Sequence, residues 1–390
     1  MIRVAIIGTG AIANAHVQAY LQFPGRCEIV ALVDIVPDKA ENMKAKYELE
    51  VACVYDSHVK ILNRNDIDLV DVCTPPFVHS AISIDCMKAG MNVVCEKPMA
   101  ASLEECDAML RARDESGKRL SIIAQNRFRK PISDLKALLD SGIAGKVNSV
   151  QVDSFWWRGH SYYDLWWRGT WEKEGGGCTL NHAVHHIDML LWMMGMPNAV
   201  TSVISNVAHD NAEVEDLSMS ILTYPGALAQ LTASVTHHGE EQKLVFQCDK
   251  AKISAPYECF ASTSKENGFP ERDETVENKL NRFRESRPRI KWEGHVGQLD
   301  NVLTALETDV PVAISGEDGR RTIELICAIY KSGAEGRTIS LPISKNDPFY
   351  TVEGILSKVP HFYKKNKELK SLDGNITVGS SYETKGEHTR

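Results

Sequence analysis

Two short segments of the chain carry side chains that could move a proton or stabilise charge on a substrate oxygen. The first is Glu96-Lys97-Pro98, and the second runs from Gly175 to Asp188, where three glycines precede three histidines. Lys97 follows a predicted strand, where open α/β sheets place ligands, and Pro98 restricts the Lys-Pro link to extended or cis geometry. A lysine there can stabilise a developing alkoxide. From local features alone, a surface lysine in a turn is an equally good interpretation.

The three histidines lie on a predicted helix. Asn181 and His185 are four residues apart and should share one face, with His182 and His186 forming the next such pair. A neutral histidine beside a substrate hydroxyl is a suitable general base near pH 7, and Asp188 could orient His185. Paired histidines on a helix could instead bind zinc. Because no other ligand cluster has obvious spacing, we predict no metal site.

The start of the chain has the order of elements that binds a dinucleotide. A β-branched run leads into Gly8-Thr9-Gly10-Ala11-Ile12-Ala13, helix formers follow, and a second apolar run ends in Asp34. Gly8 permits the tight turn, Gly10 leaves space for a pyrophosphate, and the helix N-terminus faces its charge. Asp34 can accept hydrogen bonds from a ribose diol. Its carboxylate repels a 2′-phosphate, and Ile35 offers no compensating positive charge, so we predict NAD rather than NADP.

Composition limits the class of protein. A chain of 390 residues predicts two domains, and a net charge of −8 argues against nucleic acid or an anionic membrane as the main partner. No apolar run approaches the length of a membrane span, and a strand that begins at Ile2 leaves no room for a signal peptide. Ten scattered cysteines without a C-x-x-C pair favour buried free thiols in a reducing compartment, so we expect a cytoplasmic protein.

The hydrophobic pattern predicts an α/β fold of two domains. Strands and helices alternate over residues 1–125, as in a doubly wound parallel sheet. Residues 126–345 contain alternating segments typical of an antiparallel sheet with one face covered, followed by a long helix. Within that domain, residues 258–291 are polar and indicate an insertion loop or partly ordered flap. Residues 346–390 are predicted to be a partly flexible C-terminal extension.

An aromatic segment, residues 155–166, could recognise a sugar. Aromatic faces stack on the C–H faces of sugar rings, and polar neighbours such as His160 bind hydroxyls. An aromatic core of the second domain explains Trp157 and Tyr163 equally well. His295, farther along the chain, is expected to cap a helix.

Together these segments resemble the glucose–fructose oxidoreductase and inositol dehydrogenase family over residues 1–341. The order and spacing of many separate motifs make the resemblance specific. The motifs are the glycine turn at 8–13, Thr74-Pro75-Pro76 with His79, Ala89-Gly90-Met91-Asn92-Val93 leading into Glu96-Lys97-Pro98, Asn126-Arg127-Phe128, Trp167-Arg168 before the three glycines, and the helix with His185 and Asp188.

The resemblance implies an N-terminal Rossmann domain and a C-terminal α/β domain with a large, open, mainly antiparallel sheet. Lys97 and His185 match the family's catalytic lysine and histidine, and Trp167 and Arg168 match a pair that lies along the nicotinamide cofactor. Many members carry aspartate where this chain has Asn181. An amide cannot take a proton, so Asn181 is expected to position the substrate or His185.

These considerations give one set of predicted site residues. The catalytic residues are Lys97, His185 and Asn181. The cofactor-binding residues are Gly8, Gly10, Ala11, Ile12, Asp34, Ile35, Thr74, Pro75, His79, Glu96, Lys97, Asn126, Trp167 and Arg168. The substrate-binding residues are Lys97, Arg127, Trp157, His160, Tyr163, Asn181, His182 and His185.

The predicted function is NAD-dependent oxidation of a secondary alcohol on a sugar, glycoside or cyclitol ring, with His185 as base and Lys97 stabilising the oxygen. An NAD-dependent glycosidase that oxidises its substrate transiently and recycles the cofactor is the alternative. A non-catalytic NAD sensor is a third class, against which Lys97 and His185 argue. An open sheet cannot leave a wide apolar face in water, and relatives bury it against a second subunit, so we expect a homodimer or homotetramer.

Overall fold

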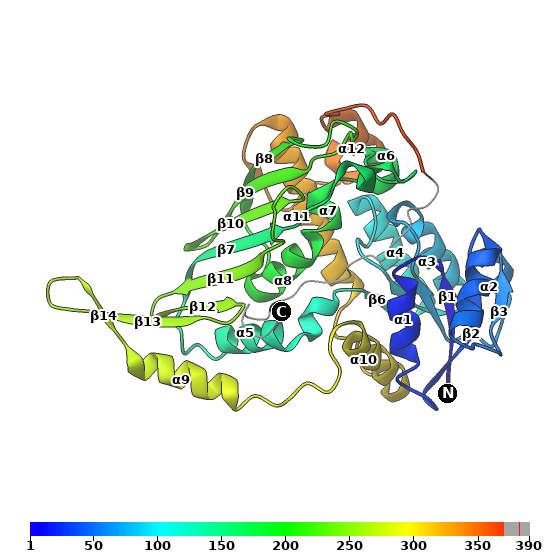
Figure 1. The fold of residues 1–390 in the computed structure, drawn as a ribbon, viewed down its shortest axis with the longest axis horizontal. Coiled ribbons are helices and arrows are strands. Elements are labelled where there is room, and N and C mark those ends of the chain that lie inside the picture. Colours follow the sequence, from blue (N-terminus) through cyan, green and yellow to red (C-terminus); the bar gives the residue numbers. More distant parts are fainter. Residues whose placement is uncertain (370–381, 383–390) are drawn as a thin grey trace.

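The computed structural model describes residues 1–369 and Tyr382 (Figure 1). Its first domain is built on a six-stranded sheet in the order β3-β2-β1-β4-β5-β6, and every neighbouring pair is parallel. The prediction of a doubly wound parallel sheet is therefore confirmed. The strands are β1 Ile2–Ile7, β2 Cys27–Val33, β3 Cys53–Tyr55, β4 Leu69–Val72, β5 Asn92–Cys95 and β6 Leu120–Ile122.

Helices connect these strands on both faces of the sheet. Helix α4 shows how the sequence sets their limits: the Ser102 hydroxyl accepts from Glu105 N at its start, and Gly117 adopts a left-handed conformation at its end. The α-helices are α1 Ala13–Tyr20, α2 Pro37–Lys46, α3 His79–Lys88 and α4 Leu103–Ser116, and the 3₁₀ turns are η1 His58–Ile61, η2 Pro76–Val78 and η3 Gln125–Phe128.

The second domain contains a nine-stranded sheet in the order β14-β13-β12-β11-β7-β10-β9-β8-β15. All its pairs are antiparallel except β10 with β7, so the prediction of a large, mainly antiparallel sheet is confirmed. The strands are β7 Val147–Phe155, β8 Ala199–Ser205, β9 Leu217–Tyr224, β10 Ala227–Ser234, β11 Gln242–Cys248, β12 Ala251–Ala255, β13 Cys259–Ser264, β14 Pro270–Arg272 and β15 Ile339–Ser340.

Helices cover one face of this sheet. Helix α11 packs against β8, α8 against β7, and α5 against β12 (Figure 1). The helices and 3₁₀ turns of this half of the chain are α5 Lys130–Asp140, η4 His160–Asp164, α6 Trp171–Glu174, α7 Cys178–Asn181, α8 Val184–Met194, α9 Glu274–Glu285, α10 Gly294–Thr308, α11 Gly316–Glu335, η5 Pro348–Tyr350 and α12 Val352–Lys358.

The opposite face of the nine-stranded sheet carries exposed apolar side chains. Along β9, alternate residues are buried, and the residues between them point outward. Because Met219 pairs with Val203 of β8, the two outward side chains are neighbours. The outward apolar residues, each between 48% and 70% exposed, are Val203, Met219, Ile221, Leu228 and Phe260.

The structure corrects the expectation for residues 258–291. This segment is not an open loop or flap, because β13 and β14 extend the sheet and α9 packs beside β13. The Glu277 carboxylate accepts from Ala261 N at 3.0 Å and from Arg272, which ties the helix to both strands. Leu280 supplies the buried contact on the helix face. Polar composition concealed this order because most of the segment's other side chains face solvent.

The domain boundary is also less simple than the sequence suggested. Helix α10 lies within residues 126–345, yet it packs against α1 of the first domain. Its buried Leu299, Val302 and Leu303 complete the apolar cluster beneath the first sheet. Arg26 reinforces the contact through ion pairs with Asp300 and Glu307. The chain therefore returns to the first domain before entering α11.

The C-terminal extension is folded over its first half. Phe349, Tyr350 and Ile355 of η5 and α12 are buried, and η5 contacts both α4 of the first domain and α11 of the second. The remainder of the predicted flexible tail, residues 370–381 and 383–390, lies outside the described residues. Among the residues described, no helix combines the length and apolar character needed to cross a membrane, and all ten cysteines are free.

Candidate active site

The glycine turn after β1 is shaped to admit a ligand. Gly8 has a φ of +90°, and a Cβ there would lie 2.7 Å from the carbonyl oxygen of Cys73. Gly10 is different, because a Cβ at this position would meet nothing within 4 Å, and both Gly10 and Ala11 are exposed. The turn is thus tightly held at Gly8 and open at Gly10, beside the N-terminus of α1, as a pyrophosphate site requires.

Asp34 at the end of β2 faces this turn. One carboxylate oxygen accepts from Thr9 N at 2.9 Å and from Thr9 Oγ1 at 2.8 Å, and the other accepts from Val36 N at 2.9 Å. Ile35 beside it is 82% exposed. The carboxylate is fixed where a ribose would lie, and the adjacent exposed side chain carries no positive charge.

Buried polar atoms without partners lie at the same edge of the sheet. Thr74 Oγ1 follows β4, and Asn126 Nδ2 follows β6; neither has a hydrogen-bond partner among the residues described. Because a buried polar group without a partner is costly, these atoms suggest a ligand that supplies the missing hydrogen bonds. With the glycine turn and Asp34, they form a donor and acceptor set that fits a dinucleotide.

His79 was predicted to contact the cofactor, but its side chain points into the core instead. Its side chain is fully buried, with Nδ1 2.8 Å from Pro98 O and Nε2 2.7 Å from Thr74 O. Both ring nitrogens are occupied by the protein. His79 therefore joins the Thr74-Pro75 turn to the segment after Lys97, and shapes the cofactor region from within the core.

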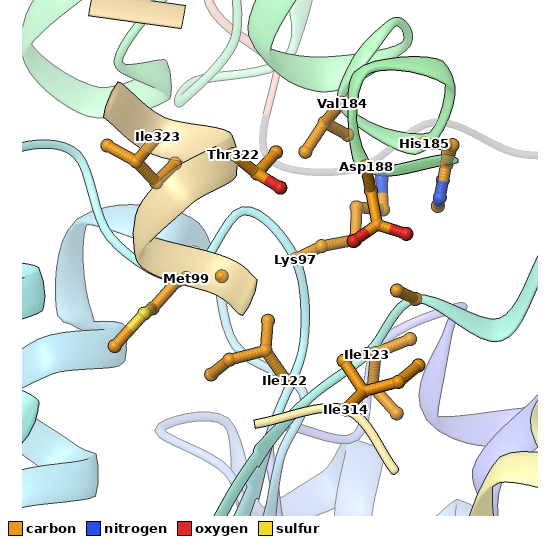
Figure 2. Close-up of a pocket in the computed structure, with 12 residues that line it drawn as sticks. Lys97, Met99, Ile122, Ile123, Val184, His185, Asp188, Ile314, Thr322 and Ile323 are labelled. Carbon is orange, nitrogen blue, oxygen red and sulfur yellow. The ribbon is translucent and has the colours of Figure 1, made fainter. Parts of the chain in front are cut away.

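Lys97 and His185 meet in one pocket between the two domains (Figure 2). Lys97 lies on the loop after β5, its link to Pro98 is cis, and its Nζ donates to Asn181 O at 3.2 Å. Burial lowers the pKa of Lys97. Burial also lowers the pKa of His185 well below its usual range, and the charge of Lys97 lowers it further. His185 is accordingly neutral near pH 7 and able to accept a proton.

A buried charged network lies directly behind Lys97. Glu96 accepts from Lys97 N at 3.0 Å with one oxygen, and its other oxygen lies 2.9 Å from His16 Nε2. His16 Nδ1 lies 2.7 Å from Asp71. Burial, the largest single effect, lowers the pKa of His16, but the charges of Asp71 and Cys73 and the hydrogen bonds to both together raise that pKa well above normal. The imidazolium of His16 is thus held between two carboxylates.

The same network corrects the expectation for His295. Its side chain does not cap α10; instead, Nε2 lies 3.6 Å from Glu96 Oε1 and the ring packs against His16. Burial would raise the pKa of Glu96, but His16 and His295 together lower it well below normal. His16, Glu96 and His295 are close enough to hold a metal ion. The His16 distances to both carboxylates are those of hydrogen bonds, which already occupy both ring nitrogens of His16, whereas the buried His295 Nε2 has no hydrogen-bond partner among the described residues.

The three histidines after the glycine run do not share a helix. The chain forms α7, breaks at His182 and Ala183, and begins again as α8, so Asn181 and His185 lie on separate helices. Asn181 Nδ2 donates to Gly176 O at 2.9 Å and to Gly177 O at 3.3 Å. These bonds turn the amide back on the glycine run. The prediction of one continuous helical face was wrong because side-chain bonding to the glycine carbonyls competes with helix continuation.

Glu215 anchors the glycine run from below. Its carboxylate accepts from Gly177 N and Thr179 N, both at 3.0 Å, and from the Tyr330 hydroxyl at 3.0 Å. A Cβ at Gly177 would lie 1.8 Å from Glu215 O, so only glycine fits there. Burial raises the pKa of Glu215 to about 7. No local sequence pattern pointed to this contact, which joins residues far apart in the chain.

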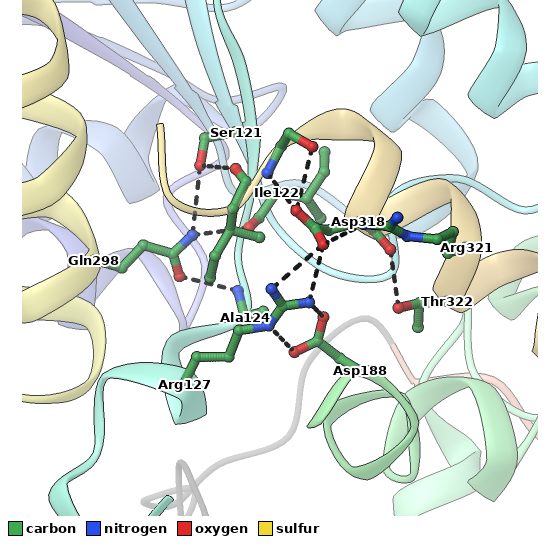
Figure 3. Close-up of polar contacts among 11 residues, drawn as sticks. Ser121, Ile122, Ala124, Arg127, Asp188, Gln298, Asp318, Arg321 and Thr322 are labelled. Atoms are coloured by element: carbon green, nitrogen blue, oxygen red, sulfur yellow. Dashed lines mark hydrogen bonds and ion pairs between the residues drawn. The ribbon is translucent and has the colours of Figure 1, made fainter. Parts of the chain in front are cut away.

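Asp188 and Arg127 have structural roles that differ from those predicted. Arg127 Nε and Nη2 donate to the two oxygens of Asp188 at 2.8 and 2.6 Å, and Asp318 lies 3.3 Å away on α11 (Figure 3). Asp188 therefore binds Arg127 rather than orienting His185. The guanidinium of Arg127 is almost fully buried in this cluster. It joins η3, α8 and α11, and is not presented to a substrate.

Trp167 and Arg168 form a stacked group with Tyr162, here called the Trp167-Arg168 wall. The Arg168 guanidinium lies 4.1 Å from the ring centroids of both Trp167 and Tyr162, and donates to Glu174 at 2.7 Å. Its buried Nε has no hydrogen-bond partner among the described residues. The positive charge of Arg168 contributes to lowering the pKa of Lys97. Neither Trp167 nor Arg168 is among the residues that line the pocket of Figure 2, so their predicted contact with the cofactor stays a prediction.

The predicted substrate residues from the aromatic segment are divided. Tyr163 is only 1% exposed and packs against Tyr162 and His209, so it belongs to the core. Trp157 is largely exposed and stacks on His238. His160 is paired with Asp210 at the surface. The alternative of an aromatic core thus holds for Tyr163 but not for Trp157, and substrate binding by Trp157 and His160 stays a prediction.

His182 and His186 point to different neighbours. His182 Nε2 lies 3.4 Å from the Tyr162 hydroxyl, and its ring also meets Trp156. His186 Nε2 lies 3.1 Å from the hydroxyl of Tyr382. The zinc alternative for this pair therefore has no geometric support. Tyr162 is a neighbour of His182 that the sequence analysis missed, although it lies inside the aromatic segment singled out there.

Comparisons with known proteins agree with this arrangement. A model of an oxidoreductase family with an NAD-binding Rossmann fold matches residues 2–124, and a model of the GFO/IDH/MocA C-terminal domain matches residues 132–254. An inositol 2-dehydrogenase from Rhizobium meliloti is 25% identical over 346 residues, covering 87% of this chain and 99% of the relative. A 2,7-anhydro-N-acetylneuraminate hydratase from Mediterraneibacter gnavus is 30% identical over 54% of each chain.

One solved structure is similar over most of both chains. It is the WlbA dehydrogenase from Bordetella pertussis in complex with NADH and UDP-GlcNAcA, with a TM-score of 0.77 and 27% identity. The similarity covers 88% of this chain and 98% of that one. The likeness therefore includes both domains and the cleft between them.

The environment of Asp34 predicts which dinucleotide binds more tightly. We expect the Kd for NAD to be at least about 10-fold lower than that for NADP, because the carboxylate would repel a 2′-phosphate and about 1.4 kcal/mol corresponds to tenfold in affinity. Fluorescence titration of the purified protein with each nucleotide measures both constants. The Asp34→Asn variant keeps the side-chain shape without the charge and should narrow the difference. Equal or tighter NADP binding by the wild type would contradict the argument.

Proposed function

The chain belongs to the GFO/IDH/MocA oxidoreductase family, and we propose that it oxidises a ring secondary alcohol of a sugar, glycoside or cyclitol with NAD. The observation that carries this proposal is that Lys97 and His185 line one pocket, in a chain whose first domain also carries the glycine turn held by Asp34. One residue comes from each domain, so the substrate would be held where the domains face each other. Relatives named inositol dehydrogenases support the substrate class.

The two side chains have complementary tasks in such a reaction. Bound NAD would supply the hydride acceptor. His185 is neutral because burial and Lys97 lower its pKa, so it can take the hydroxyl proton as the C–H bond is broken. The Lys97 ammonium stabilises the negative charge that develops on the same oxygen. Asn181 positions Lys97 through its backbone carbonyl, at 3.2 Å from Nζ.

A redox-neutral reaction is the second candidate. One relative that is 30% identical over about half of this chain is named a hydratase, which denotes addition of water rather than net oxidation. An NAD-dependent glycosidase, in which a ring carbon is oxidised and later reduced by the same cofactor, would use His185 and Lys97 in the same way. Net oxidation has the broader support, because two relatives that cover 87% of this chain are named inositol dehydrogenases, whereas the two hydratases cover 54% and 65% of it.

A substrate panel separates these candidates. Inositols, free sugars, uronic acids and aryl glycosides should be supplied with NAD, and both NADH and released aglycone should be measured. We expect NADH to accumulate with at least one polyol or sugar. Aglycone release without accumulation of NADH would favour the glycosidase instead. Tight NAD binding without either product across the panel would contradict both catalytic proposals.

The catalytic assignment predicts the effect of two substitutions. Lys97→Met and His185→Gln should each lower kcat by about 10²- to 10⁴-fold, the usual contribution of a positioned acid–base group, and NAD affinity should change little. His58→Gln is a control, since His58 pairs with Asp85 elsewhere in the first domain.

The low pKa of His185 also predicts that the acid limb of the kcat–pH profile lies below pH 6.5, because the neutral base persists as the pH falls. Near-normal turnover of either variant, or an acid limb above pH 6.5, would refute the corresponding role.

The exposed face of the nine-stranded sheet supports the proposal of a homodimer or a tetramer built from dimers. Its apolar side chains lie close together across β8 and β9, and packing against a second copy would remove them from water. Light scattering should show a dimer or tetramer at micromolar concentration. Ile221→Glu at the centre of this face should give monomers, whereas Val51→Glu, at an exposed apolar position in the first domain, should not. A monomeric wild type would refute the proposal.

A further inference from the structure

The segment after α12 runs across the chain that carries the Trp167-Arg168 wall. Residues 359–369, here called the C-terminal strap, continue from α12 beside α6 (Figure 1). At its start, Pro360 O accepts from Trp171 Nε1 at 3.0 Å, and Phe362 N donates to Glu213 O at 3.0 Å. The strap is therefore attached to the two stretches of chain that flank the Trp167-Arg168 wall.

The central contact of the strap is made by one ammonium group. Lys365 Nζ donates to the carbonyl oxygens of Tyr163 at 2.5 Å, Leu165 at 2.6 Å and Arg168 at 2.7 Å. An ammonium has three donors and no acceptor, so three converging carbonyls use its full capacity. The Lys365 side chain is half-buried, and this burial lowers its pKa.

The end of the strap pairs with the same short segment. Leu369 N donates to Asp164 O at 2.7 Å, and Leu369 O accepts from Trp166 N at 2.9 Å. Lys367 forms an ion pair with the Asp164 carboxylate at 2.8 Å. Residues 163–168 are thus held by partners about 200 positions later in the chain, and their conformation depends on the strap.

The held segment is the one that presents the cofactor pair. The guanidinium of Arg168 stacks between the rings of Trp167 and Tyr162, and its positive charge contributes to lowering the pKa of Lys97. Trp166 makes an edge contact with Phe77, at 6.2 Å between ring centroids, in the turn that follows Pro75. A shift of residues 163–168 would move this wall relative to the cofactor turn of the first domain.

We propose that Lys365 is a positioning residue for cofactor binding: by fixing the carbonyl oxygens of Tyr163, Leu165 and Arg168, it holds Trp167 and Arg168 against the NAD pocket. This inference rests on the proposed function, since it takes the cleft beside the glycine turn as the NAD site. The C-terminal extension is accordingly part of the binding machinery, although none of its residues 359–369 is assigned a contact with NAD.

Substitution of Lys365 tests the proposal in the full-length protein. Lys365→Met removes three charge-assisted hydrogen bonds and leaves the carbonyls without that donor. We expect the Kd and KM for NAD to rise at least about 5-fold, the lower end of typical coupling between sites, with kcat at saturating NAD changed little. Lys364→Met makes the same change at the exposed neighbouring position and should bind NAD like the wild type. Lys365→Arg retains the charge and several donors and should restore part of the affinity.

Hydrogen exchange without NAD separates this inference from the proposed function. Peptides covering residues 162–171 should exchange faster in Lys365→Met than in Lys364→Met, while peptides from the first sheet remain unchanged. Unchanged exchange at 162–171 would overturn the role of Lys365 in holding the segment. Faster exchange with an unchanged NAD Kd would overturn the link to cofactor binding. If the wild type itself failed to bind NAD, the proposed function would fall and the assignment to cofactor positioning with it, whereas the exchange result would still decide whether Lys365 holds the segment.

Discussion

A buried carboxylate in the first domain fixes the backbone from which Lys97 projects. Removing Glu96 from water is costly, and burial alone would favour its protonated form. The imidazolium of His16, itself held by Asp71, and the nearby ring of His295 offset that cost and keep Glu96 ionised. Glu96 in turn accepts the backbone N–H of Lys97. The lysine thus projects from a backbone tied to a charged core rather than from a free loop.

In the second domain another buried carboxyl group, that of Glu215, holds the backbone that leads to His185. Glu215 is buried beneath the glycine run and accepts two backbone N–H groups there, which sets the direction of α7 and of the chain leading to His185. Arg127 of η3, which follows the last strand of the first sheet, then binds two helices of the second domain, because its guanidinium lies between Asp188 of α8 and Asp318 of α11. The relative position of Lys97 and His185 therefore depends on buried carboxyl groups and a buried guanidinium, and of these Asp188 also lines their pocket.

Local sequence patterns predicted the parts of the site that are contiguous in the chain. The glycine turn, Asp34 and the Glu96-Lys97-Pro98 segment were found because a strand, its turn and the next helix are neighbours in sequence. The partner of Asp188 could not be found in this way, since Arg127 is separated from it by 61 positions. The strap was hidden for the same reason. The helix of three histidines was misjudged because periodicity does not reveal that Asn181 bonds backward to the glycine carbonyls.

That backward bond explains how the site can function with an amide where the resemblance leads one to expect a carboxylate. An aspartate in the present conformation of Asn181 would place negative oxygen against the carbonyls of Gly176 and Gly177, whereas the amide donates to both. Position 181 therefore fixes the turn and does not share a proton with His185. Burial and Lys97 then determine the pKa of His185, and both lower it. A base of low pKa remains neutral over a wide pH range but accepts a proton less readily, so in the proposed reaction stabilisation of the substrate oxygen by Lys97 would contribute a correspondingly larger part of the lowering of the barrier.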